Sequence, residues 1–366
     1  MSRVWLPCGD YHENYKKDQG WWQTNFIKGK MTLLLVTVFV LLPLGLSDYW
    51  LGVATMIGYT AMGALGVQLL IGFTGLITLG HAAFIAVGAY TSTMMVLQFP
   101  WPQAIVDMGL AYPLSVIAAG FTGGIWCVLF GLPSAKVKGF YLILTTMAAQ
   151  FITVDFILTQ YISQIGGRGQ AFSLPPGLIK IGPWALDTEL RVYFFMAFIL
   201  AVMIVVLANL LRSKPGRAWV AIRDNDIAAE ALGINVFRYK LLAFFVAGFT
   251  AGVTGAFWVS NTAALSPEHF PWFWSLWLVG VILIGGVGSI HGAIYGSIFM
   301  VVIMELLQIA VIPLSMHYPA LIINFAYIKD MAFGLAICAF LIYEPNGLAY
   351  RWWQSRNYFN LWPFSY

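Results

Sequence analysis

Residues 31–71 read MTLLLVTVFVLLPLGLSDYWLGVATMIGYTAMGALGVQLLI and contain a single charged side chain, Asp48. A helix crosses the hydrocarbon core of a bilayer with about 20 apolar residues, so this stretch is long enough for two crossings. The same pattern continues toward the C-terminus, where Glu268 and Glu305 are the only charged side chains between Leu241 and Ile328. Because an unpaired charge near the middle of a bilayer costs several kcal/mol, such gaps indicate a chain that folds in lipid.

The composition agrees with a membrane protein. The 366 residues are 60% hydrophobic and 9% charged, whereas soluble domains carry about 25% charged residues. The sequence predicts an all-α, polytopic membrane protein with about ten transmembrane helices. The regions 76–97 and 272–312 are broken by glycine and could be half-helices or re-entrant segments. The ten apolar segments are 31–47, 49–71, 76–97, 111–132, 139–160, 190–211, 239–260, 272–289, 292–312 and 320–343.

The distribution of lysine and arginine predicts the orientation of the chain. If the N-terminus is cytoplasmic and all ten segments cross, 15 of the 19 basic residues lie on the cytoplasmic side. The four on the other side are Arg168, Lys180, Arg191 and Lys329. Cytoplasmic loops are enriched in these residues, so we expect an N-in/C-in topology. The chain then has a cytoplasmic tail (1–30), one transmembrane domain (31–343) with a long cytoplasmic loop (212–238), and a cytoplasmic C-terminal tail (344–366).

The long cytoplasmic loop predicts two short helices. Residues 213–240 read SKPGRAWVAIRDNDIAAEALGINVFRYK, and Lys214–Pro215–Gly216 should break the preceding helix. A short helix is expected over 216–223 and a second over 227–232, with Asp226 as its N-cap and Gly233 at its C-terminal end. A rigid loop of this kind suits the transmission of movement from a soluble partner, whereas composition alone favours a solvated connector.

Two glycine-rich segments interrupt the apolar helices. Residues 72–90 read GFTGLITLGHAAFIAVGAY and residues 282–296 read ILIGGVGSIHGAIYG. Unwound backbone is tolerated in a membrane where it lines a cavity inside the protein, so the first segment is a candidate for the solute path. The second lacks the lysine of a phosphate-binding loop, and close helix packing explains its glycines. The same packing is expected at three pairs spaced by four residues: Gly120 and Gly124, Gly248 and Gly252, and Gly292 and Gly296. The two segments resemble each other loosely.

Single polar residues within the apolar segments are further candidates. His81 follows the first glycine break, and we interpret it as a packed histidine with satisfied hydrogen bonds rather than as a direct ligand. Glu305 lies inside an apolar segment, where a carboxyl group marks a functional or helix-pairing position; we place pairing or packing ahead of contact with a solute.

Together these motifs resemble one family. The loop GRAWVAIRDNDIAAEALGINVFRYKLLAF, the run GFTGLITLGHAAF and the ending YEPNGL are similar to the permease subunits of ABC importers for branched-chain amino acids, a family that includes urea and short-amide permeases. The resemblance runs from about Gly63 to Leu348. Two positions depart from it, since Leu76 stands where a polar residue is expected and His291 where a bulky one is expected.

The resemblance implies two sets of functional residues. The contact of the loop with an ATP-hydrolysing subunit would include Gly216, Arg217, Arg223, Asp224, Asn225, Ala228, Ala229, Glu230 and Gly233. The solute path would include Gly72, Thr74, Gly75, Thr78, Gly80, His81, Gly285, Gly286, Gly288 and Glu305.

The predicted function is that of a permease subunit, not an enzyme, that moves branched-chain amino acids across the bacterial inner membrane. No G-x-x-x-x-G-K-[ST] motif occurs, so ATP and Mg²⁺ are expected on partner subunits, with no cofactor or metal on this chain. The resemblance implies as partners a second, homologous permease, two ABC ATPase subunits and a periplasmic solute-binding protein, besides the lipid bilayer; no nucleic-acid motif is present.

Several alternatives remain open. The solute could be urea, a short amide or an aromatic acid. An ion-coupled secondary transporter needs buried ionisable groups, for which Glu305 and Asp155 are the candidates, and neither it nor a passive channel gives the structured loop a role. A membrane enzyme fits poorly, because the five histidines are scattered without the spacing of a metal site or catalytic triad.

Overall fold

The computed structural model describes residues 25–135, 139–162, 172–173, 179–182, 184–262, 264–315 and 324–361. Within these ranges, nine helices are long and apolar enough to cross a membrane, and the 17-residue helix His81–Leu97 is a shorter apolar one. Each of the ten predicted segments therefore corresponds to a helix. Most of the predicted N-terminal tail, the loop residues Lys136 and Lys138, and most of 161–189 lie outside the described ranges.

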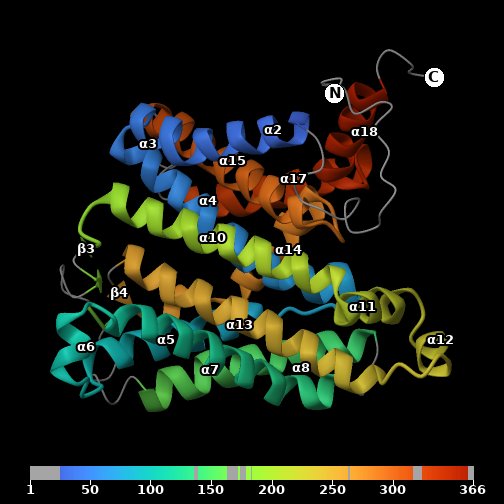
Figure 1. Cartoon of the computed structure of the whole chain (residues 1–366), viewed down its shortest axis with the longest axis horizontal. Coiled ribbons are helices and arrows are strands. Elements are labelled where there is room, and N and C mark those ends of the chain that lie inside the picture. The colour runs from blue at the N-terminus through green and yellow to red at the C-terminus, as the bar shows by residue number, and fades with distance from the viewer. Residues whose placement is uncertain are drawn as a thin grey trace.

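The long helices run side by side along the longest axis of the molecule (Figure 1). In chain order the elements are α2 (Asn25–Val36), η1 (Thr37–Leu41), α3 (Leu42–Gly45), α4 (Asp48–Val67), η2 (Gln68–Phe73), α5 (His81–Leu97), α6 (Gln103–Asp107), α7 (Ala111–Ser134), α8 (Phe140–Phe151), η3 (Ile152–Ile162), β1 (Phe172–Ser173), β2 (Lys180–Ile181), β3 (Trp184–Ala185), α10 (Glu189–Arg212), α11 (Lys214–Asp224), α12 (Asp226–Ala231), α13 (Val236–Thr262), β4 (Ala264–Leu265), η4 (Pro267–His269), α14 (Trp272–Gly285), α15 (Ile290–Ser315), α17 (Phe325–Tyr343) and α18 (Gly347–Leu361).

The centre of the bundle is packed through glycine. Helix α13 lies against α5 and α7, and α5 also lies against α7. A β-carbon on Gly248 would lie 2.5 Å from the carbonyl oxygen of Gly123, and β-carbons on Gly252 and Gly296 would clash with the backbones of Ala119 and Val281. Real side chains do not fit at such distances, so the close packing predicted for the paired glycines is confirmed.

Helix α4 joins this cluster to the rest of the molecule, because it packs against α10, α13, α14 and α15. Its middle and end are almost wholly buried, as expected of a helix surrounded by others. In contrast, α2 and α17 bury little of their surface, with Leu33 and Leu335 exposed by 65% and 62%. Their outer faces are therefore suited to lipid or to another membrane subunit.

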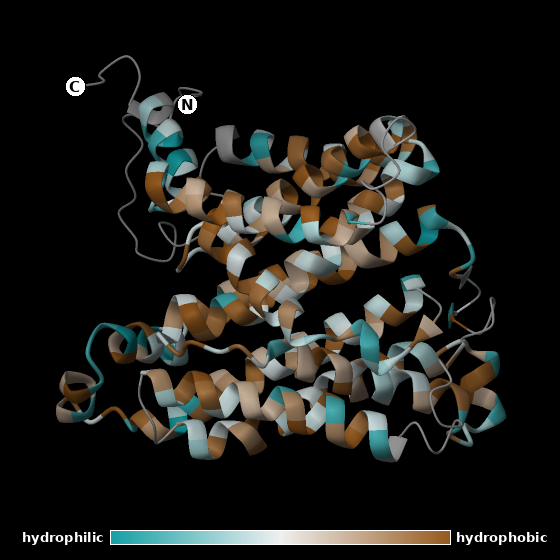
Figure 2. Cartoon of the chain, turned by 180° about the vertical axis from the view of Figure 1, so that it is seen from behind, coloured by the Kyte–Doolittle hydropathy of each residue, from teal (hydrophilic) through white to brown (hydrophobic). Residues whose placement is uncertain are grey.

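The two ends of the bundle differ. The antiparallel pairs β1–β4 and β2–β3 lie at one end, whereas α11, α12 and α18 lie at the other (Figure 1). Hydrophobic residues dominate the long helices, and hydrophilic ones are frequent in α18 and around α11 and α12 (Figure 2). The start of α2 lies at the same end as α18, because the Lys30 ammonium is 4.8 Å from the ring centre of Trp352.

Candidate functional site

The predicted break before the loop helices is confirmed. Helix α10 ends at Arg212, Ser213 has an extended backbone, and Pro215 occupies the first turn of α11, where its missing N–H does no harm. Gly216 is buried against the backbone of Leu211 in α10, where a side chain would not fit. The fully buried Trp219 fixes α11 to α13, since its indole N–H donates to the carbonyl oxygen of Tyr239 at 2.8 Å. The loop is therefore a packed part of the molecule.

Helix α12 is capped by Asn225, so the prediction of Asp226 as the N-cap is wrong. The Asn225 side-chain oxygen accepts from the backbone N–H groups of Ile227 and Ala228 at 3.0 and 3.1 Å. Asn225 has the extended backbone of a capping residue, whereas Asp226 already belongs to the first turn and lies 3.7 Å from the Lys240 ammonium. At the other end, Gly233 has φ +83°, which confirms its predicted place after the helix.

The outer surface of α12 is more apolar than a free connector requires. Ile227 and Leu232 are exposed by 71% and 82%, while Ala229 faces inward and is buried. Burial of a large aliphatic side chain contributes about 1.5–3 kcal/mol, so these two side chains are suited to a protein partner. Neither residue was predicted from the sequence, although both are large apolar residues in a polar loop.

The other residues predicted for the partner contact also lie on these two helices. Arg217 and Asp224 on α11 and Ala228 and Glu230 on α12 are exposed.

Arg223 links this loop to the glycine breaks inside the bundle. From the last turn of α11, its guanidinium donates a hydrogen bond of 2.5 Å to the carbonyl oxygen of Gly72. A β-carbon on Gly288 would lie 2.8 Å from the same guanidinium nitrogen, and one on Gly75 would lie 3.4 Å from the Arg223 side chain. One arginine of the loop therefore contacts both glycine-rich segments.

The two glycine-rich segments also contact each other directly. The Gln68 amide donates to the carbonyl oxygens of Gly286 and Ser289 at 3.0 and 2.8 Å. A β-carbon on Gly72 would lie 2.7 Å from the backbone nitrogen of Gly288. This contact requires glycine at position 72, and the φ of +85° at Gly288 favours glycine at that position.

Each segment is an interruption between two helices. On one side, α4 ends in the π-helical turn η2 and the chain becomes helical again only at His81, five residues later than the predicted start at residue 76. On the other side, α14 stops at Gly285 and α15 starts at Ile290. Gly75 and Gly286 have φ of +71° and +115°, which ends the helices at these points. The glycine breaks predicted from the sequence are thus real and lie face to face.

The start of α5 is held by side chains of other helices. The Ala82 N–H donates to Ser275 of α14 at 2.9 Å, and the Leu79 N–H donates to Thr146 of α8 at 3.2 Å. Gly80 is pressed against the Thr146 backbone. These contacts explain why the helix restarts here without a capping side chain of its own.

His81 is packed as predicted but its hydrogen bonds are not satisfied. The side chain is fully buried, and neither ring nitrogen has a hydrogen-bond partner among the described residues. The interpretation of a satisfied histidine is therefore wrong. Thr74 and Thr78 are buried too and bond locally, Thr74 to the carbonyl oxygen of Leu70 at 2.5 Å. Thr74, Thr78 and His81 thus place buried polar groups inside the bundle beside the first glycine break.

Glu305 lies far from these groups. Its carboxylate accepts a hydrogen bond from the Tyr49 hydroxyl, which joins α15 to the first turn of α4. Tyr49 precedes Gln68 by 19 residues on one continuous helix, which is about 28 Å at 1.5 Å per residue. Glu305 therefore joins two helices at the other end of α4 and does not meet the glycine breaks.

The match to a known family covers the whole region that holds this site. Residues 49–318 match the family described as "Branched-chain amino acid transport system / permease component". The chain belongs to this family of permease components.

Named relatives agree with that assignment. The permease is 29% identical over 345 residues to the high-affinity branched-chain amino acid transport system permease protein LivM of Escherichia coli K12, covering 87% of this chain and 75% of the relative. It is 26% identical over 295 residues to a probable LivM of Methanocaldococcus jannaschii, covering 78% and 82%. Against LivH of Escherichia coli K12 it is 25% identical over 257 residues, covering 66% and 79%. No solved structure matches.

Proposed function

We propose that this permease is one of the two membrane-spanning subunits of an ATP-driven importer for branched-chain amino acids. The observation that carries the proposal is the bond of Arg223 to the Gly72 carbonyl, because it joins an exposed helical loop to the interruptions of the transmembrane helices. A passive channel or an ion-coupled transporter gives this link no task. Glu305, the carboxyl that ion coupling would use, is already bonded to Tyr49.

The proposed mechanism runs from the loop to the helices. An ATPase subunit docks on α11 and α12, with Ile227 and Leu232 as apolar anchors and the exposed Glu230 and Arg217 at the rim. When two ATPase subunits close on ATP, α12 and α11 move together, since Trp219 and Asn225 keep them rigid. Arg223 carries that movement to the meeting point of Gly72 and Gly288.

The glycine breaks then act as the moving part of the path. The hydrogen bonds of Gln68 hold the two breaks together, and separating them would open the bundle at the loop end. The buried, unpaired nitrogens of His81 lie further along the same break and would face a polar solute once the segments part. Alternating access around interrupted helices is a common design of transporters.

The proposal also assigns partners and orientation. The chain resembles both LivM and LivH, which supports a heterodimer of two homologous permeases. We place α11, α12, α18 and the start of α2 on the cytoplasmic side of the inner membrane, where 15 of 19 basic residues are then found. A solute-binding protein would deliver the amino acid at the opposite end.

The test is ATP-dependent uptake by the assembled transporter. The permease would be reconstituted in proteoliposomes with its second permease and ATPase subunits and the binding protein, and leucine uptake measured with ATP and with a non-hydrolysable analogue. Uptake is expected only with ATP. Urea, acetamide and phenylalanine would be offered in parallel, and preference for one of these would replace the assigned solute.

Two variants locate the docking surface. Leu232→Asp and Glu230→Arg should abolish capture of the ATPase subunits by the affinity-tagged permease. Glu268→Arg reverses a similarly exposed charge in η4, which lies before α14 and away from the loop, and should capture them normally. Normal capture by both loop variants, or uptake without nucleotide, would rule out the proposed mechanism.

A further inference from the structure

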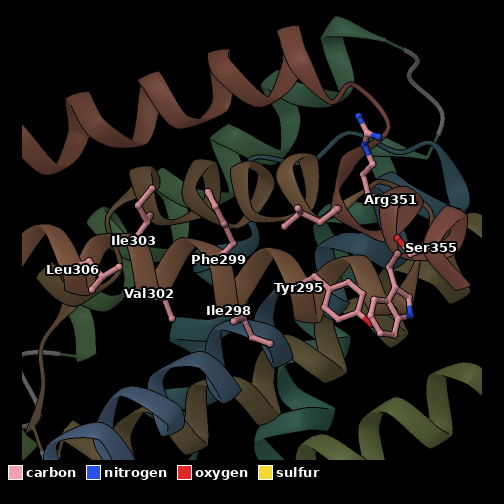
Figure 3. Close-up of a pocket in the computed structure, with 10 residues that line it drawn as sticks. Tyr295, Ile298, Phe299, Val302, Ile303, Leu306, Arg351 and Ser355 are labelled. Atoms are coloured by element: carbon pink, nitrogen blue, oxygen red, sulfur yellow. The ribbon is translucent and has the colours of Figure 1, made fainter. Parts of the chain in front are cut away.

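An apolar groove of about 690 Å³ lies between α15 and α18. Its long wall is formed by side chains of α15 from Tyr295 to Leu306, and α18 closes one end with Arg351 and Ser355 (Figure 3). Trp352 also lines the groove. Ile298 and Leu306 are exposed by 43% and 53% although they line the groove. The described part of the chain thus leaves an apolar surface uncovered next to a polar end.

The dimensions fit one leaflet of a membrane. Tyr295 and Leu306 are 11 residues apart on one helix, which is about 16 Å. The hydrocarbon core of a bilayer is about 30 Å thick, so one leaflet contributes about 15 Å. A groove of this length can hold an acyl chain from the headgroup level to the middle of the membrane.

Helix α18 marks the headgroup level. Its axis lies at a steep angle to the axes of the long helices in both whole-chain views (Figures 1 and 2). Trp352, Trp353 and Tyr358 are exposed by 47%, 54% and 57% on this one helix. Tryptophan and tyrosine concentrate at membrane–water interfaces, and a helix lying in the interface presents them to lipid.

The polar end of the groove is basic. The Lys30 ammonium lies over the ring of Trp352 at 4.8 Å, and Trp352 lies beside Tyr295, with the two ring centres 5.9 Å apart. Arg356 is exposed and follows Trp352 by one helical turn on α18, so it lies at the same end of the groove as Lys30. Lys30 and Arg356 are the basic rim of the groove.

Arg351, the basic residue that itself lines the groove, already has a partner. Glu344 is bonded to Arg351, whose guanidinium holds the pKa of that carboxyl below its usual range, so this pair is already internally balanced. Within the described residues, no carboxylate is bonded to Lys30 or Arg356. Two positive side chains held near each other at the polar end of an apolar groove call for an anion with an apolar tail.

We propose that this groove binds one anionic phospholipid, with an acyl chain along α15 between Tyr295 and Leu306 and the headgroup phosphate at Lys30 and Arg356. The residues that line the groove do not include the docking surface on α12. Basic clusters between transmembrane helices at the cytoplasmic surface are suited to acidic headgroups, and each basic side chain near such a surface contributes about 1 kcal/mol.

The test uses a phosphatidylglycerol with a photoactivatable acyl chain. The full-length permease is placed in nanodiscs of phosphatidylcholine with a trace of the probe, irradiated and digested, and the labelled peptides are identified by mass spectrometry. Labelling is expected on the α15 peptide that contains Ile298 and Val302. Unlabelled phosphatidylglycerol should compete, whereas phosphatidylcholine and glycerol phosphate should not.

Three variants separate the headgroup from the groove. Lys30→Gln and Arg356→Gln should each weaken the competition by about fivefold, since 1 kcal/mol is about a factor of five in affinity. Ile298→Trp should block labelling by filling the groove. Lys180→Gln removes an exposed charge at the opposite end of the bundle and should change nothing.

Several results would overturn the proposal. Equal labelling by a phosphatidylcholine probe would show that no headgroup is recognised, and competition by glycerol phosphate would show an anion site without a bound acyl chain. Loss of labelling after assembly with the second permease would show that the groove is a subunit interface. Size-exclusion profiles and melting temperatures in detergent exclude misfolding as the cause of a lost signal. Because none of these measurements uses transport, the result is independent of the proposed function.

Discussion

Replacing Arg223 by methionine tests the link between the loop and the transmembrane helices. Methionine keeps much of the apolar part of the arginine side chain but cannot donate a hydrogen bond. The Gly72 carbonyl oxygen, which accepts from Arg223 at 2.5 Å, then loses its donor. Hydrogen bonds that involve a charged group contribute about 1.5–3 kcal/mol, and Arg223 is partly solvated, so we take the lower value. A loss of about 1.5 kcal/mol changes an equilibrium by slightly more than tenfold.

The assay compares transport with ATP consumption. In proteoliposomes that contain the complete importer, Arg223→Met should lower the leucine taken up per ATP hydrolysed by about tenfold, while the ATPase rate changes by less than about twofold, because docking on α12 is untouched. Arg223→Lys should recover part of the ratio, since an ammonium offers one donor in place of the planar guanidinium. Arg238→Met removes an exposed arginine of the same region and should leave the ratio unchanged. An unchanged ratio in Arg223→Met would refute the idea that this bond transmits movement.

Three further changes test separate parts of the structure. Asn225→Ala removes the N-cap of α12 and should destabilise that helix by about 1 kcal/mol, seen as roughly fivefold faster amide exchange in its first turn with an unchanged global melting temperature. Gly252→Ala places a methyl group against the α7 backbone and should lower the melting temperature in detergent by several degrees, whereas Gly334→Ala meets open space and should not. Glu305→Gln and Tyr49→Phe should be non-additive in a double-mutant cycle by about 1 kcal/mol and leave leucine affinity unchanged; a large loss of affinity in Glu305→Gln would instead place this carboxyl on the solute path.

The sequence predicted the helices well because lipid imposes simple constraints on composition. Uncharged spans reflect the solvent that surrounds the helix, and glycines four residues apart reflect close contact with a neighbouring helix. Both patterns are visible in the sequence without knowing which helix is the neighbour. The interruption near Gly75 was also predicted, because Gly72, Gly75 and Gly80 weaken the continuity of a helix. Its length was underestimated, because the restart at His81 depends on Thr146 and Ser275 from other helices.

Tertiary contacts explain what the sequence could not predict. Asn225 and Asp226 are equally good caps by residue type, and only the extended backbone of Asn225 decides between them. Gln68 looked like an isolated polar residue in an apolar helix, yet it donates to the backbone of a segment 218 residues away. Likewise, Arg223 resembled a residue for an external partner, and its contact with Gly72 inside the bundle became evident only in three dimensions.

Glycine at the meeting point of the two breaks has a mechanical consequence. Interlocked side chains resist separation because close-packed interiors transmit displacement as strain. Between Gly72 and Gly288 the backbones touch without side chains, so the two segments can part without repacking a core. The hydrogen bonds that then oppose separation are the two donated by Gln68 to Gly286 and Ser289, about 1 kcal/mol each. A contact of a few kcal/mol lies within the range that partner binding can supply. In the proposed mechanism, closure of ATPase subunits on α11 and α12 would open it and their release would restore it.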